Sequence, residues 1–473
     1  MSLPAPLDTY QQVFALSMLS NRASAFTGPA AALQQQLQYE LSSYLSGTNL
    51  KTVSNGGFVP DTDPLPGLLP GIPTYLGDWT LEWGPVVFSH TRKDGKPTGV
   101  ADNAVFVASC PAVTFPGCPN TNQSNQPTGT LTTYVVAIAA TNPTSIYDWT
   151  VEDFDVSSSV PWNGWTPGNL TPASKPVGLT TPVISMGTAI GVSTVLSLTP
   201  PAAAPGSGQT LPQFLSQLKP GPNSAIVFTG HSLAGALSPT TAFQLQRSGA
   251  LSGFAYNLVY PTAGATPGNL PFVSAFNTAF PSPPKDPATG ATWQIPAGAP
   301  YQCWNTLLWN RYDVVPHAWY AFFGGSPKLS EIPTLYGSPA LSSVSDLATG
   351  AAANSAFSTA IYAHTRNAPL PGTLQPGVML GSSYVSTPTP PTAFEQFLAQ
   401  LYVQHIGMYS GIPANPPQIP NATPGVILPS PVPHPSPALP RLPGVSTLEL
   451  DLEAFAQRIL TQIEDWLKKH HLP

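Results

Sequence analysis

The sequence contains little charge. Asp, Glu, Lys and Arg together make up 8% of the 473 residues, whereas about a quarter is usual in globular proteins. The formal net charge of −6 is mild and negative. Nucleic acid binding depends on positive charge, so we expect no nucleic acid partner.

Cysteine is scarce as well, with three residues in the chain. Cys110 and Cys118 enclose a short loop that contains proline and glycine, and this spacing permits a disulfide that would leave Cys303 over. Three reduced thiols are the alternative. No group of cysteines and histidines has the spacing of a metal site, and nothing in the sequence requires a metal or another cofactor.

Long apolar runs are missing. No stretch of about 18 consecutive apolar residues occurs, so we expect no membrane span. The N-terminal segment lacks a basic region followed by an apolar core, and we identify no signal peptide in it. Scarce charge and abundant proline nevertheless favour a secreted protein over a cytosolic one.

Proline is abundant, with 59 residues, and apolar residues make up 42% of the chain. Because proline is excluded from helix interiors and central strands, these residues imply long ordered loops. Proline is dense over 412–446, which we expect to be a stiff, extended linker with no core of its own. Residues 1–411 then form the catalytic domain.

The segment after this linker, 447–473, has a different pattern. We expect an amphipathic helix there, with acidic residues early and lysines late, as suits the helix dipole. It docks on its own domain or mediates self-association with a second copy; contact with a lipid surface is the alternative, although its polar face is not strongly basic. Its apolar residues at helical spacing are Leu448, Leu452, Phe455, Ile459, Ile463 and Trp466.

Strand and helix patterns alternate along the first domain. This alternation predicts an α/β fold with a mostly parallel central sheet and helices on both faces. The predicted strands are Trp79–Ser89, Val100–Ser109, Thr130–Ala140, Ala225–Thr229, Leu258–Tyr260 and Cys303–Trp309. The predicted helices are Ala30–Leu45, Pro182–Leu198, Leu211–Leu218 and Leu233–Gln246.

One strand-to-helix junction, VFTGHSLAGAL, has the pattern of a nucleophile elbow. Ser232 lies between Gly230 and Ala234, and an elbow needs small residues there because the serine backbone is strained and the helix passes close to the strand. Such a turn exposes the serine Oγ at the carboxyl edge of the sheet. The neighbouring His231 is expected to orient the elbow rather than to accept the serine proton.

An elbow serine requires an acid and then a histidine further along the chain. Asp313 follows the strand-like CWNTLLWN, which places it at the carboxyl end of a strand, and His405 lies in YVQHIGMY, where we expect a last loop before the linker. The other acids after Ser232 and before the linker are Asp286, Glu331, Asp346 and Glu395, and the other histidines are His317 and His364.

These segments together resemble the class 3 (fungal-type) lipase family of the α/β-hydrolases. GHSLAGAL is similar to that family's elbow with Ala234 in place of a glycine, and NRYDVVPHAW is similar to its acid motif. YVQHIGMY resembles the histidine motif. The segments Tyr260–Asn277 and Val135–Val156 resemble the strand after the elbow helix and the oxyanion strand, where Ala139-Ala140-Thr141 replaces the usual R-G-[ST].

The resemblance implies roles for five residues. Ser232 would be the nucleophile, Asp313 the orienting acid and His405 the general base, and the Leu233 N–H with Thr141 would form the oxyanion hole. It also implies a lid after the oxyanion strand, at Val156–Trp165; the alternative is an ordinary loop with buried tryptophans. Residues 318–323 would line an acyl pocket or belong to the core.

The expected function is therefore hydrolysis of acylglycerols or similar fatty-acyl esters through a Ser-His-Asp triad and an acyl-enzyme, at an oil–water interface. A short-chain, feruloyl or polyester esterase and a phospholipase A1 would use the same triad. The non-enzymatic alternative is a hydrolase-like scaffold that binds a lipid or a partner.

Overall fold

A computed structural model describes residues 7–46, 50–52, 58–60, 76–91, 97–119, 129–140, 155–295, 298–320, 327–380, 383–410 and 423–425. The predicted tail helix, 447–473, lies outside the described residues. So does the predicted linker, 412–446, except for residues 423–425. Here Pro424 O accepts a hydrogen bond from Gln11 Nε2, and Thr423 is buried, so this part of the linker packs against the domain.

The central sheet has seven strands in the order β13-β11-β9-β8-β5-β4-β3. The pairs from β13 to β5 are parallel, and β4 and β3 extend the sheet with antiparallel pairs. The strands are β3 (Thr80–Phe88), β4 (Asn103–Thr114), β5 (Thr130–Ile138), β8 (Ser224–His231), β9 (Tyr256–Thr262), β11 (Leu307–Asn310) and β13 (Asn367–Leu370). The predicted mostly parallel sheet is confirmed.

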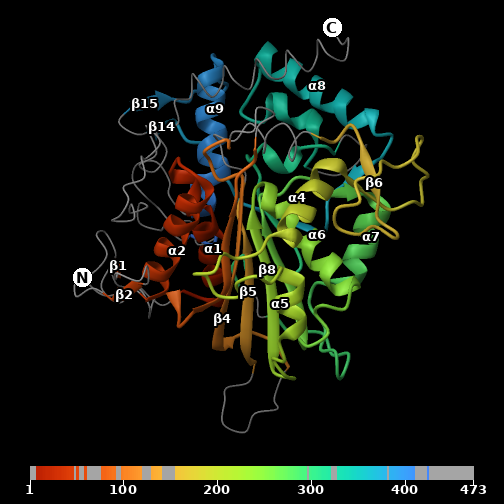
Figure 1. Ribbon diagram of the computed structural model, residues 1–473. Helices are drawn as coiled ribbons and strands as arrows, with labels where there is room; N and C mark the ends of the chain where they lie inside the picture. Colours follow the sequence, from red (N-terminus) through yellow and green to blue (C-terminus); the bar gives the residue numbers. More distant parts are fainter. Residues whose placement is uncertain are drawn as a thin grey trace.

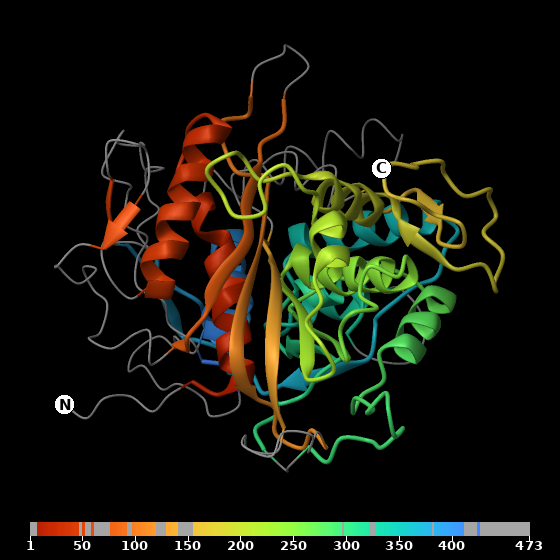
Figure 2. The same ribbon diagram turned by 60° about the horizontal axis from the view of Figure 1, so that its bottom comes forward.

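Helices cover both faces of this sheet (Figures 1 and 2). The N-terminal helices α1 (Thr9–Ser20) and α2 (Ala30–Ser46), with the short η1 (Asn21–Ala25), lie on one face. The other face carries α4 (Met186–Ser197), α5 (Leu211–Gln217), α6 (Leu233–Arg247) and α7 (Leu270–Ala279). Each face has its own apolar core, and the alternating residues of β5 and β8 divide between the two.

Smaller elements surround the sheet. A four-stranded antiparallel sheet joins β12 (Tyr362–Ala363), β10 (Gly268–Asn269), β7 (Val183–Ser185) and β6 (Ser159–Pro161). The hairpins are β1 (Leu50–Thr52) with β2 (Phe58–Pro60), and β14 (Gly377–Leu380) with β15 (Ser383–Ser386). The remaining helical segments are η3 (Val315–His317), η4 (Leu329–Thr334), α8 (Ser342–Phe357), α9 (Phe394–Tyr402), η5 (Val403–Gly407) and α10 (Met408–Ser410).

The structure differs from the sequence predictions at several boundaries. The helix predicted from Pro182 begins only at Met186, because Ser185 caps it after the strand β7. The strand predicted from Cys303 begins at Leu307, because Asn305 has a φ of 58°. Cys110, Cys118 and Cys303 are thiols and form no disulfide. In the part of the chain that the structure describes, no helix is long and apolar enough to cross a bilayer.

Candidate active site

Ser232 lies in a strained turn between β8 and α6. Its φ of 58° and ψ of −127° put a non-glycine residue in a rarely populated backbone conformation, which must be held by its surroundings. The Ser232 N–H donates to Thr262 O of the neighbouring strand at 3.1 Å. All residues of β8 are buried, so the strand fixes where the turn begins.

Small residues on both sides of this turn allow the helix to approach the sheet. A Cβ on Gly235 would lie 2.4 Å from Thr262 O and 2.7 Å from Gly264 Cα, both backbone atoms. A Cβ on Gly230 would lie 2.5 Å from the Ala234 Cβ. The small residues of the GHSLAGAL pattern are therefore required by close packing of α6 against β8 and the β9 loop.

The structure brings together Ser232, His405 and Asp313. The Ser232 Oγ lies 2.8 Å from His405 Nε2, and His405 Nδ1 lies 2.9 Å from each carboxylate oxygen of Asp313. Asp313 is fully buried, whereas Ser232 and His405 each keep 8% of their surface exposed. The hydroxyl can thus donate to one ring nitrogen while the other donates to the carboxylate.

Two more donors hold the Asp313 carboxylate. The Val315 N–H donates to Oδ1 at 3.0 Å, and the Tyr409 hydroxyl donates to Oδ2 at 2.8 Å. That hydroxyl accepts in turn from the Asn310 N–H at 2.7 Å. Burial, followed by the negative charge of Asp313, raises the pKa of Tyr409 well above 10, so this phenol stays protonated and remains a donor.

Tyr409 is a site residue that the sequence analysis did not identify. The prediction that a loop carries His405 is wrong, since α9 runs directly into the π-helical turn η5, which contains His405. Tyr409 follows His405 by four residues, which places the two side chains one turn apart on a helix. A helical interpretation of YVQHIGMY would therefore have pointed to Tyr409.

Asn310 joins the end of β11 to the turn that carries His405. Its Nδ2 donates to Gln404 O at 2.8 Å and to Gln404 Oε1 at 2.7 Å, and the Gln404 Nε2 donates to Thr373 O at 2.8 Å. The residue before His405 is thereby fixed to the strand that leads to Asp313. This explains why an asparagine precedes the acid in NRYD.

His231 supports the elbow from within the core. Its Nε2 lies 2.8 Å from His405 O, which can only accept, and its Nδ1 lies 2.9 Å from the Thr262 hydroxyl. The ring is 1% exposed, and burial lowers its pKa well below 6.5. A neutral ring that carries its proton on Nε2 satisfies both contacts. Since His405 O and the Thr262 hydroxyl then bind the two nitrogens, neither nitrogen is left to accept the Ser232 proton.

The structure describes one of the two residues that were expected to form the oxyanion hole. Leu233 is the first residue of α6, where N–H groups have no partner within the helix. Thr141 lies outside the described residues. The chain just before it is anchored, because the Ala140 N–H donates to Asn21 Oδ1 at 2.6 Å, and Asn21 Nδ2 donates to Ser17 O at 3.2 Å.

The two tryptophans of Val156–Trp165, where the resemblance implies a lid, are buried at the end of α6 that is far from Ser232. Trp162 and Trp165 are each 2% exposed and stack on one another with ring centroids 5.7 Å apart. The Arg247 guanidinium lies 4.3 Å above the Trp162 ring and donates to the carbonyl groups of both tryptophans. Arg247 ends α6, about 20 Å from its start at a rise of 1.5 Å per residue. The alternative of buried tryptophans is correct for this segment.

The other candidate acids and bases do not take part in the hydrogen bonds that join the Ser232, His405 and Asp313 side chains. His317 Nδ1 donates to the backbone oxygen of Asp313, and Asp286 accepts from the Tyr256 hydroxyl at 3.1 Å. His364 Nε2 donates to Pro327 O at 3.2 Å. Of the AWYAFF segment, residues 318–320 are described, and Trp319 packs in a small core with Val156 and Tyr362.

No protein-family model and no curated protein matches this sequence. Among solved structures, M37 lipase is 22% identical, the match covers 85% of this chain and 91% of that chain, and the TM-score is 0.54. Matches to a lipase of Rhizopus microsporus var. chinensis (16% identity, 66% and 70% covered, TM-score 0.29) and to lipase II of Rhizopus niveus (13%, 66% and 76%, TM-score 0.29) are weaker.

The similarity to M37 lipase and the strand order agree on the fold. A mostly parallel sheet with helices on both faces and a serine at the strand-to-helix turn is an α/β-hydrolase fold, as predicted. This fold has the carboxyl ends of its parallel strands at one edge, and Ser232 and Asp313 follow two of those ends, β8 and β11.

Proposed function

We propose that this chain is a serine carboxylic ester hydrolase of lipase type. The observation that carries the proposal is the continuous hydrogen-bonded chain from the Ser232 Oγ through His405 to Asp313, at a turn where the serine has positive φ. The shared fold with a protein described as a lipase supports the same class.

In the proposed reaction, the Ser232 Oγ attacks the ester carbonyl carbon while His405 Nε2 takes the hydroxyl proton. His405 then gives this proton to the departing alkoxide, and the alcohol leaves with the carbonyl–oxygen bond broken. Water attacks the acyl-enzyme with His405 again as the base, which releases the carboxylic acid and restores Ser232. Asp313 keeps the ring in the tautomer that has Nε2 as the acceptor and stabilises its protonated form.

The negative charge on the carbonyl oxygen needs donors at the start of α6. We assign the Leu233 N–H to this role, since the helix dipole favours an anion there, and we retain Thr141 as the second donor. The Asn21–Ala140 hydrogen bond supports this second assignment by fixing the chain next to Thr141.

The proposed substrates are acylglycerols or similar fatty-acyl esters presented at an oil–water interface. A chain-length series of p-nitrophenyl esters from acetate to palmitate separates this substrate class from a short-chain esterase. Feruloyl esters, a polyester film and phosphatidylcholine test the other esterase activities and phospholipase A1. Absence of turnover with all of these substrates would favour the non-enzymatic scaffold.

The test of the triad uses matched serine variants on one helix. Ser232→Ala should lower kcat at least about 1000-fold, because the nucleophile is lost. Ser238→Ala is the control, since the Ser238 hydroxyl is buried on α6 without a hydrogen-bond partner among the described residues. A fluorophosphonate should label the wild type on the peptide that contains Ser232. Full activity of Ser232→Ala would overturn the proposal.

The division into a catalytic domain (1–411), a linker (412–446) and a tail helix (447–473) also remains a proposal. Removing residues 447–473 and measuring the molecular mass in solution tests whether the tail mediates self-association. A fall from several chains per particle to one after truncation would support it, and an unchanged number of chains per particle would contradict it.

A further inference from the structure

Residues 329–336, which comprise η4 and the two residues after it, lie beside the backbone that carries Asp313. The Tyr336 hydroxyl of this segment donates to Tyr312 O at 2.9 Å, and its Glu331 carboxylate lies 3.4 Å from His317 Nε2. His317 Nδ1 donates in turn to Asp313 O at 2.7 Å. The segment is therefore connected to the backbone before the acid and, through His317, to the backbone oxygen of the acid itself.

The partners of the His317 ring determine where its proton lies. A backbone oxygen can only accept, so the nitrogen that contacts Asp313 O must carry the proton. The ring is buried, and burial lowers its pKa below 6.5, which keeps it neutral near pH 7. Trp309 packs edge-on against the ring with ring centroids 5.6 Å apart. His317 is thus a neutral donor that packing holds in one orientation toward Asp313.

The same segment belongs to an apolar core that reaches both the acid and the base of the triad. Tyr336 and Val403 are buried in this core, and Tyr312 and Val314 pack against it from the two sides of Asp313. Val403 begins the turn η5, which carries the proposed general base. The core therefore holds the turn of the acid and the turn of the base against one another.

The position of the Asp313 backbone matters because its side chain is short. Both carboxylate oxygens lie 2.9 Å from His405 Nδ1, and a shift of the backbone would change these contacts directly. Catalytic side chains have to be held to within about 0.5 Å of the productive geometry by the residues around them. A donor fixed on Asp313 O limits such a shift.

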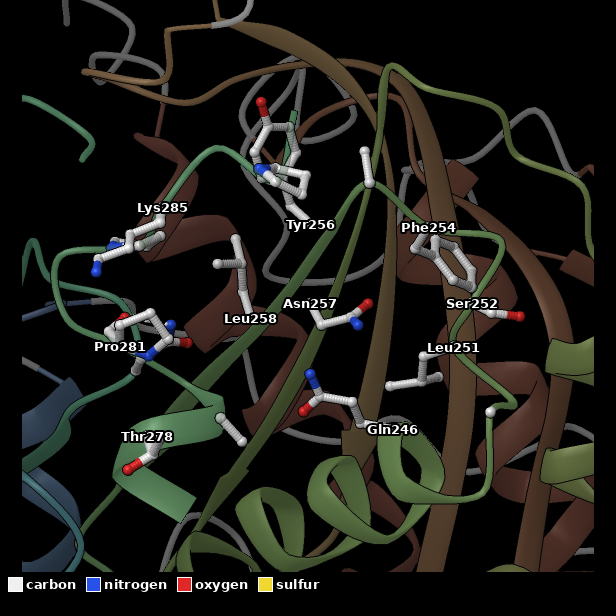
Figure 3. Close-up of a pocket in the computed structure, with 16 residues that line it drawn as sticks. Gln246, Leu251, Ser252, Phe254, Tyr256, Asn257, Leu258, Thr278, Pro281 and Lys285 are labelled. Atoms are coloured by element: carbon white, nitrogen blue, oxygen red, sulfur yellow. Dashed lines mark hydrogen bonds between the residues drawn. The ribbon is translucent and has the colours of Figure 1, made fainter. Parts of the chain in front are cut away.

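A cavity of about 430 Å³ elsewhere in the molecule is separate from this arrangement (Figure 3). Tyr256, at the start of β9, lines it, whereas Thr262, which contacts Ser232, lies at the end of that strand. None of the residues that hold Asp313 is among the described residues that line this cavity. Substitutions around Asp313 therefore leave the lining of the cavity unchanged.

We propose that His317 is a positioning residue of the triad, which holds the Asp313 carboxylate toward His405 by donating to the Asp313 backbone oxygen. Tyr336 has the same role through Tyr312. Both residues act through the acid and not on the substrate. This inference rests on the proposed function, because it assigns the two residues to the same site.

The first test compares variants that keep or remove the donor at position 317. His317→Leu should lower kcat for p-nitrophenyl butyrate about tenfold, with KM changed less than about twofold. His317→Asn places an amide N–H near the position of Nδ1 and should restore kcat to within about threefold of wild type. His317→Gln, whose amide reaches the position of Nε2 instead, should show the loss of the leucine variant and replaces it where His317→Leu does not fold.

A matched pair of tyrosine variants tests the second residue. Tyr336→Phe should lower kcat about fivefold with KM unchanged. Tyr260→Phe is its control, since the buried Tyr260 hydroxyl also donates to a backbone oxygen, that of Tyr301, at 2.9 Å and away from the site. Circular dichroism confirms that each variant is folded before its rate is compared.

Proton NMR provides a readout that does not require turnover. The proton between His405 Nδ1 and the Asp313 carboxylate should give a signal far downfield, which is identified by its absence from His405→Gln. We expect this signal to shift or disappear in His317→Leu and His317→Gln and to persist in His317→Asn. Absence of ester turnover by the wild type would overturn the proposed function, whereas the NMR comparison would still test the positioning role.

Three results would overturn the proposal itself. Wild-type kcat and an unchanged NMR signal in His317→Leu or His317→Gln would show that the donor does not position Asp313. Equal losses of kcat in His317→Asn and His317→Leu would show that ring packing, rather than the donor, is what matters. Equal kcat in Tyr336→Phe and Tyr260→Phe would exclude the role of Tyr336.

Discussion

The hydroxyl of Tyr409 connects the Asn310 backbone to the Asp313 carboxylate. Tyr409→Phe removes one donor from a buried charge, which costs about 1.5 kcal/mol or more. We expect kcat for a p-nitrophenyl ester to fall about tenfold or more with little change in KM, because the phenol contacts the acid and not the substrate. Steady-state kinetics at one pH measures both constants.

The matched control is Tyr260→Phe. Tyr260 is also buried, and its hydroxyl donates to Tyr301 O at 2.9 Å, away from the site. Its replacement should lower stability without lowering kcat. An equal loss of kcat in the two variants would show that Tyr409 acts through general stability rather than by positioning Asp313.

The sequence predicted the three residues that meet in the site but not the residues that hold them. Ser232 and Asp313 each come after a segment whose amino-acid sequence is typical of a strand, so their positions could be recognised locally. Tyr409 and Asn21 act through contacts between distant segments, 96 residues from Asp313 and 119 residues from Ala140. Such contacts depend on how elements pack, which a single sequence does not show without an alignment of relatives.

The contact between α6 and the loop after β9 determines which substitutions the elbow tolerates. Gly235→Ala would place a Cβ against backbone atoms of Thr262 and Gly264 that cannot move aside, and we expect a loss of about 3 kcal/mol and of activity. Ala234→Gly restores the residue usual in the resembling family and should keep activity, at a cost of about 1 kcal/mol in helix propensity. Urea denaturation and ester hydrolysis measure both effects.

Helix α1 contacts separate parts of the site. Asn21, at its C-terminal end, binds the Ala140 N–H, while Phe14 packs edge-on against His231 with ring centroids 6.3 Å apart. Gln11 binds Pro424 O, and the next residue, Gly425, donates to Tyr409 O. A helix that is mostly buried in this way lacks a clear polar face, and this explains why Thr9–Ser20 gave no helical pattern in the sequence.

We expect Asn21→Ala to reduce kcat about tenfold. Complete loss of an oxyanion donor costs about 100- to 1000-fold, and loosening the chain next to Thr141, the proposed second donor, should have a smaller effect. Asn21→Asp keeps an acceptor for the Ala140 N–H and should restore most of the rate. Gln38→Ala on α2 is the control, since the Gln38 amide donates instead to Ala203 O, between α4 and α5. Equal kcat in Asn21→Ala and Gln38→Ala would contradict the role of Asn21.

At the scale of the whole molecule, two apolar cores enclose one sheet, and the site lies where segments from both faces meet. The core that contains α1 includes Tyr260 and Tyr409, and the core beneath α6 includes Leu233 and Val259. The alternation of strand and helix patterns along the chain made this layering predictable from the sequence. The edge strand β13 was not predictable, because Asn367–Leu370 is short and contains Pro369, which is tolerated at a sheet edge.

The packed interior also predicts how stability depends on pH. Burial lowers the pKa of His231, His317 and His364, that of His364 to about 3. In the unfolded chain these rings titrate near 6.5, so below that pH the unfolded state binds protons that the native state does not. The contribution of these histidines to stability is therefore fully present above pH 6.5 and falls as the pH decreases, by about 1 kcal/mol for His364 between pH 7.5 and 5.5.

His364→Gln isolates this contribution, because glutamine does not titrate and retains an N–H donor for Pro327 O. Urea unfolding of the wild type and the variant at pH 7.5, 6.5 and 5.5 gives the two pH dependences. The variant should lose about 1 kcal/mol less than the wild type over this range, while carboxylate titrations shared by both proteins cancel in the difference. Parallel curves would mean that His364 is protonated in the native state, and its burial without a counter-charge would then need another explanation.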